Sequence, residues 1–151
     1  MMKRLIITLV LAGGLFALTG SAEAVKPVGE KPFINVTTSP SEVNLGMVPL
    51  FGVLDKPAAL TVKVESNCAY GSIMMSATAL KHSSGYSISA KRIFVQTYIT
   101  EGYVSMDKPV MISKPQVGSN DVVVDIKVQA DTRELAGKYT GSFTFTVIPP
   151  V

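Results

Sequence analysis

Apolar and polar residues alternate in short runs from Phe33 onward. A period of two is typical of strands that turn one face to a core and the other to water. The clearest run covers residues 59–65, in which every second residue is apolar: Leu60, Val62 and Val64. We therefore expect a sheet with one buried face in this part of the chain.

Further alternating or β-branched runs predict strands over residues 33–37, 43–47, 91–99, 109–113, 121–130 and 139–147. Residues 72–80 fit either a strand or a short helical turn. Because Pro109 and Pro115 flank residues 109–113, that strand is expected at a sheet edge. Gly, Pro, Asn and Ser separate runs spaced near ten residues. The pattern predicts an all-β, immunoglobulin-like β-sandwich of about seven to eight strands, within a domain of residues 33–151.

The N-terminus has the three parts of a signal peptide. Lys3 and Arg4 precede an apolar run over residues 5–18, and Ala22-Glu23-Ala24 follows. We predict a signal peptide over residues 1–24, cut before Val25, and a flexible lead-in over residues 25–32. A retained membrane anchor is the alternative, but the run is shorter than the roughly 20 residues that span a bilayer. After cleavage no membrane span is expected, and the protein would be secreted, periplasmic or on the cell surface.

The charge pattern does not indicate a nucleic-acid partner. The net charge of +3 falls to +2 when Lys3, Arg4 and Glu23 leave with the signal. The remaining basic residues are scattered, whereas nucleic-acid binding needs a clustered basic stripe.

A single cysteine, Cys68, remains in the exported chain. One Cys cannot close a disulfide within the chain, and a leftover Cys in an exported protein suggests an intermolecular disulfide or a free thiol. Turn-forming residues on both sides favour an accessible strand end, while free Cys in general prefers burial. Both interpretations stay open.

The last predicted strand is entered through residues 135–139, Leu-Ala-Gly-Lys-Tyr. Leu135, Gly137 and Tyr139 have the spacing of a tyrosine corner, in which a Tyr hydroxyl bonds to a backbone group a few residues upstream. These three residues are predicted to have a structural role.

Catalytic chemistry is not visible in the sequence. His82 is the sole histidine, it is expected in an exposed loop, and no Gly-x-Ser-x-Gly elbow accompanies it. One His and one Cys do not make a zinc site, and the methionines are better explained as core filling than as copper ligands. Sugar-stacking Trp is absent, and the tyrosines are interpreted as scattered surface residues: Tyr70, Tyr86, Tyr98 and Tyr103. We predict no catalytic, cofactor-binding or metal-binding residues.

The tail, residues 136–147, resembles the closing strand of bacterial pilus and coat subunits, including chaperone–usher fimbrial proteins and the spore-coat-protein-U type. It runs Ala-Gly-x-Tyr and then alternates apolar residues with Thr. The resemblance implies an incomplete or swapped immunoglobulin-like sandwich that polymerises outside the cytoplasm. The chain departs from many such subunits in having only Cys68 where they carry a Cys pair.

The expected function is a non-enzymatic structural or adhesive subunit that associates with protein, including copies of itself, by strand addition at sheet edges. Phe33, Ile34 and Val36 are the candidate donor strand. A monomeric periplasmic binding or accessory module is the alternative, and an exported hydrolase is a third.

Overall fold

The structure, a computed structural model, describes residues 5–11 and 31–149. The predicted cleavage site and most of the predicted lead-in lie outside these residues. The described chain is all-β: thirteen strands and one 3-10 turn, η1 (Ala90–Arg92). Eight of the strands have four residues or more, and every pairing between them is antiparallel. Among the described residues, no helix is long and apolar enough to cross a membrane.

One layer is a five-stranded sheet in the order β2-β3-β12-β8-β9. Its strands are β2 (Ile34–Ser39), β3 (Gly52–Ser66), β12 (Asn120–Ala130), β8 (Ile93–Gln96) and β9 (Val104–Ser105). The predicted face of β3 is buried at Leu60, Val62 and Val64. The alternating apolar residues of β2, β12 and the second half of β3, most of them β-branched, favour this sheet.

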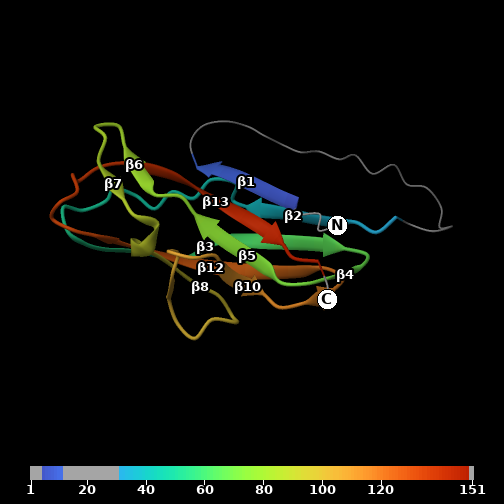
Figure 1. The fold of residues 1–151 in the computed structure, drawn as a ribbon. Helices are drawn as coiled ribbons and strands as arrows, with labels where there is room; N and C mark the ends of the chain where they lie inside the picture. The colour runs from blue at the N-terminus through green and yellow to red at the C-terminus, as the bar shows by residue number, and fades with distance from the viewer. Residues whose placement is uncertain (1–4, 12–30, 150–151) are drawn as a thin grey trace.

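The other layer has the order β10-β5-β13-β6-β7, with β1 also paired to β13 (Figure 1). Its strands are β1 (Leu5–Leu11), β5 (Ile73–Ala77), β6 (Leu80–His82), β7 (Ser87–Ile88), β10 (Val110–Ser113) and β13 (Tyr139–Val147). A small separate pair joins β4 (Ala69–Tyr70) to β11 (Gln116–Val117). The two layers enclose one core, to which β13 contributes Phe143, Phe145 and Val147.

Three strand predictions need correction. Residues 43–47 are not a strand: Gly46 has φ +88°, and its N–H donates to Asn44 Oδ1 at 2.9 Å, which makes a local turn. Residues 91–99 begin in η1, and only Ile93–Gln96 is strand. Strand β3 begins seven residues before the alternating run, at Gly52.

Two other predictions are settled by pairing. Residues 73–77 are a strand rather than a helical turn, because β5 pairs with β13 on one side and β10 on the other. β10 lies at the end of its sheet, where its flanking prolines predict it.

Candidate functional site

The loop that leads into β13 is fixed by its own tyrosine. Tyr139 Oη donates to the carbonyl oxygen of Leu135 at 2.8 Å. The ring of His82, on β6, lies 5.2 Å from the Tyr139 ring, centroid to centroid. At Gly137, a Cβ atom would lie 2.7 Å from His82 Nε2, so only glycine fits against that ring. The loop is therefore held by the Tyr139 hydroxyl and by the close approach of the Gly137 backbone to the His82 ring.

His82 corrects a sequence prediction. It is a half-buried residue of β6, not an exposed loop residue, and its Nδ1 accepts a hydrogen bond from the backbone N–H of Ser84 at 3.1 Å. Its partners are a backbone amide and the Tyr139 ring, and these hold the β6–β7 hairpin against β13.

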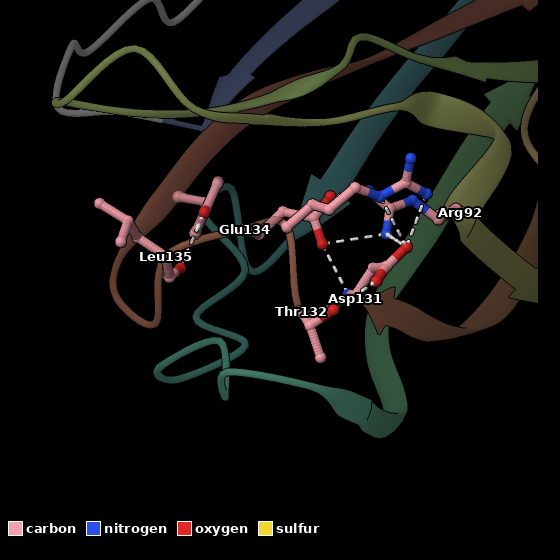
Figure 2. Close-up of polar contacts among 7 residues, drawn as sticks. Arg92, Asp131, Thr132, Glu134 and Leu135 are labelled. Atoms are coloured by element: carbon pink, nitrogen blue, oxygen red, sulfur yellow. Dashed lines mark hydrogen bonds and ion pairs between the residues drawn. The ribbon is translucent and has the colours of Figure 1, made fainter.

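An ion pair between Arg92 and Glu134 anchors the same loop (Figure 2). Glu134 is only 5% exposed, and it accepts hydrogen bonds from both terminal nitrogens of Arg92, at the end of η1. Its Oε2 also accepts the backbone N–H of Asp131 at 2.6 Å. Sequence analysis missed this pair because 42 positions separate the two residues.

The contacts of Glu134 shift its titration. The hydrogen bonds from Arg92 lower the pKa of Glu134, although burial acts in the opposite direction, and the same contact raises the pKa of Arg92. Both groups are therefore held in their charged forms. The pair acts as a clamp between η1 and the loop before β13, since a buried carboxylate needs such partners.

A groove opens beside this loop, between the two layers. It has a volume of about 280 Å³ and is lined by both charged and apolar residues, among them Glu42, Leu45, Leu54, Leu80, Val128 and Lys138. That volume lies just below the range of about 300–1,000 Å³ typical of small-molecule pockets. Among the described residues, no group of three or more His, Cys, Asp and Glu side chains could hold a metal ion.

Strand β13 has two edges with different partners. One edge pairs with β5 over Phe143–Val147 and with β6 at Tyr139 and Thr140, and the backbone N–H of Thr78 continues that ladder to the Ser142 carbonyl. The opposite edge pairs with β1, in one unbroken register from Leu5 opposite Val147 to Leu11 opposite Gly141. Because a strand has only two hydrogen-bonding edges, β1 must lie on the edge of β13 that faces away from β5 and β6.

The candidate donor residues are already paired within the chain. Ile34 and Val36 belong to β2, which pairs with β3 over its whole length, and Val36 is buried; Phe33 precedes the strand and is half exposed. Donation of this segment to a neighbour would require β2 to leave β3.

Cys68 lies next to the same segment. It is half-buried, and its Sγ lies 3.6 Å from the Phe33 carbonyl oxygen and 3.6 Å from Ser66 Oγ. Ser66 Oγ in turn donates to the Phe33 carbonyl at 3.0 Å. The thiol is thus one of the polar groups that hold the start of β2 against the end of β3.

The tyrosines do not all lie on the surface. Tyr70 is 1% exposed and belongs to the core, which corrects the sequence interpretation. Tyr103 Oη donates to Asp55 Oδ1 at 2.8 Å, and burial together with this contact raises the pKa of Tyr103 to about 12. Lys127 Nζ lies 3.8 Å from the Tyr103 ring centroid, which ties the chain before β9 to β12.

Comparison of the chain with protein-family models, with curated proteins and with solved structures found no match.

Proposed function

We propose that this chain is an exported, non-enzymatic structural or adhesive subunit with an immunoglobulin-like β-sandwich fold, which associates with other protein chains through a sheet edge. The proposal depends on the edge of β13 that pairs with β1, called the outer edge below. A segment 130 to 142 positions away in the sequence, Leu5–Leu11, pairs with it over seven residues. An edge that takes a remote segment as an added strand has the geometry that strand addition needs.

Export is the second part of the proposal. It is supported by the basic start, the apolar run and the Ala-x-Ala site of residues 1–24. The strand on the outer edge of β13 belongs to this same segment. Cleavage before Val25 would therefore remove β1 and leave the β13 edge without its partner.

The test is the mass of the exported protein in solution, measured by size-exclusion chromatography with light scattering across a hundredfold range of concentration. We expect species heavier than the monomer, and the fraction of protein in them should rise with concentration. A monomer at every concentration would contradict the subunit.

A monomeric binding module is the second candidate, and a group of exposed apolar residues close together in the sequence favours it. Met47 and Phe51 are each 68% exposed, and Leu50 and Val53 are more than half exposed. Contiguous exposed apolar residues are typical of interaction sites. A sharp monomer peak in the same measurement would favour this candidate over the subunit.

A further inference from the structure

We propose that the partner of the β13 edge is the β13 edge of a second copy of this chain, paired antiparallel across a two-fold axis centred on Thr144. This inference rests on the proposed function and deepens it, because it names the partner and the register.

The edge is long and regular. The β1 register runs without a shift over all seven residues from Gly141 to Val147. Other strands at sheet edges are shorter or less regular: β2 has six residues, β7 and β9 have two each, and the pairing of β10 shifts between Met111 and Ser113. A second chain therefore finds the longest straight ladder on β13.

The edge also lacks the features that natural proteins use to prevent pairing. Edge strands are commonly protected by charged side chains, especially Lys, or by Pro. Residues 139–147, Tyr-Thr-Gly-Ser-Phe-Thr-Phe-Thr-Val, contain neither a charged residue nor a proline. Two copies of this edge can therefore pair without electrostatic repulsion between their side chains.

A two-fold axis matches both the direction and the faces of the strands. Two copies of one strand related by such an axis are antiparallel, as β1 and β13 are, and the interface is the same patch on both chains. Centring the axis on Thr144 places Phe143 opposite Phe145 of the second copy. Both residues are buried in their own cores, so the apolar faces of the two sheets become continuous. A shift by one residue would instead set Phe opposite Thr.

In the uncut chain this edge is already occupied. Leu5–Leu11 pairs with the same residues that the second copy would use. The N-terminal segment is thus an intramolecular cap, and association through β13 begins only once that segment has been removed.

Disulfide trapping tests the register. In a Cys68→Ser background, Thr144→Cys places two thiols on directly opposite positions, about 4.5–5.5 Å apart at Cβ, close to disulfide geometry. Thr146→Cys is the matched control, since it is half-buried on the same face of the same strand. In the proposed register Thr146 lies opposite Ser142 of the second copy, and the two Thr146 positions are about 13 Å apart.

The full chain is expressed both uncut in the cytoplasm and with export, and intact mass identifies each product. Under mild oxidation we expect exported Thr144→Cys to become mostly covalent dimer, with at least tenfold less dimer for exported Thr146→Cys and for the uncut chain. Equal trapping of both cysteines, or of cut and uncut chains, would overturn the inference.

Charge substitution provides an independent readout. Thr144→Lys and Thr144→Glu should each be monomeric when exported alone, because like charges then meet across the axis, and an equimolar mixture should form a heterodimer. If light scattering shows association but Thr144 neither traps nor responds to charge, the register is wrong and the proposed subunit stands. If the exported wild-type protein stays monomeric, the proposed function fails with it.

Discussion

Single side chains hold the loop before β13. The Tyr139 hydroxyl donates to the Leu135 carbonyl. The Glu134 carboxylate accepts hydrogen bonds from Arg92 and from the backbone N–H of Asp131. Both contacts join a polar side chain to a backbone group of the loop. They therefore contribute to the conformation of the loop as well as to stability.

Replacing Tyr139 with phenylalanine removes one hydroxyl and keeps the ring against His82. The lost bond to the Leu135 carbonyl should lower the free energy of unfolding by about 0.5–1.5 kcal/mol, the usual net value of a hydrogen bond. Chemical denaturation checks this value. The control is Tyr86→Phe, at a tyrosine that is 44% exposed, which should change stability little. Equal effects of the two substitutions would mean that the Leu135 contact contributes nothing.

The lowered pKa of Glu134 makes stability depend on pH. The unfolded carboxyl titrates near 4.5, and the folded carboxyl titrates below that value. The contribution of Glu134 is therefore complete above about pH 4.5 and is lost as the pH falls through the folded pKa. The melting temperature of wild type should fall more steeply than that of Glu134→Gln as the pH is lowered from 5 to 3.

At neutral pH the Glu134→Gln variant should lose about 1.5–3 kcal/mol, the range for hydrogen bonds to a charged group. Glu65→Gln is the control, because Glu65 pairs with Lys63 on the surface, where both side chains are about half exposed. A Glu134→Gln variant as stable and as acid-sensitive as wild type would show that the clamp does not operate.

At the scale of elements, the long strand β3 is broken by a local irregularity. The register between β3 and β12 shifts between Val124 and Ile126. Ala58 has φ +47°, and its N–H donates to Asp125 Oδ1 at 2.6 Å. The Asp125 side chain on β12 thus accepts a hydrogen bond from the bulged backbone of β3 at Ala58. This contact lets β3 continue as one strand through Pro57.

Ala58 is the place where glycine should improve the protein. A left-handed conformation costs an L-residue about 1–2 kcal/mol, and glycine avoids that cost while losing about 0.5–1 kcal/mol of chain entropy. Ala58→Gly should therefore raise stability by about 0.5 kcal/mol. The neighbouring Ala59→Gly should lower it by about 1 kcal/mol, because Ala59 is buried and its φ is not positive. Thermal melts of the two variants should move in opposite directions.

At the scale of the whole molecule, the N-terminal segment decides which edges are open. With residues 5–11 attached, β13 is paired on both edges, and without them it would be paired only on the edge that β5 and β6 share. Cleavage before Val25, as proposed above, would therefore change the outer surface of the protein without removing a strand that contributes the core residues described above.

Intact-mass measurement on exported protein should give a chain that begins at Val25, because Ala22-Glu23-Ala24 has the Ala-x-Ala pattern of a signal-peptide cleavage site. A species that keeps residues 1–24 and requires detergent for extraction would contradict both export and the opening of the β13 edge. The protein produced in the cytoplasm, which should keep its first residue or lose only Met1, is the control for the measurement.

The alternation of apolar and polar residues by itself determined the strand-rich class, the buried face of β3 and the last strand. This was possible because a period of two is a local property that burial of one face requires. The hydrogen bond from Tyr139 to Leu135 could also be predicted from the sequence, because the hydroxyl and the carbonyl are only four positions apart.

Tertiary structure alone decided the contacts between distant segments. Arg92 and Glu134, Ala58 and Asp125, and His82 and Gly137 meet because sheet pairing brings their strands together. Residues 43–47 alternate as a strand would, yet they form an irregular segment, since Gly46 turns the chain and only Val48 pairs, with Gly137. The alternation of apolar and polar residues indicates which face of a strand is buried, because that depends only on neighbouring positions. Strand pairing between distant segments decides which edge of the sheet is left open for a partner.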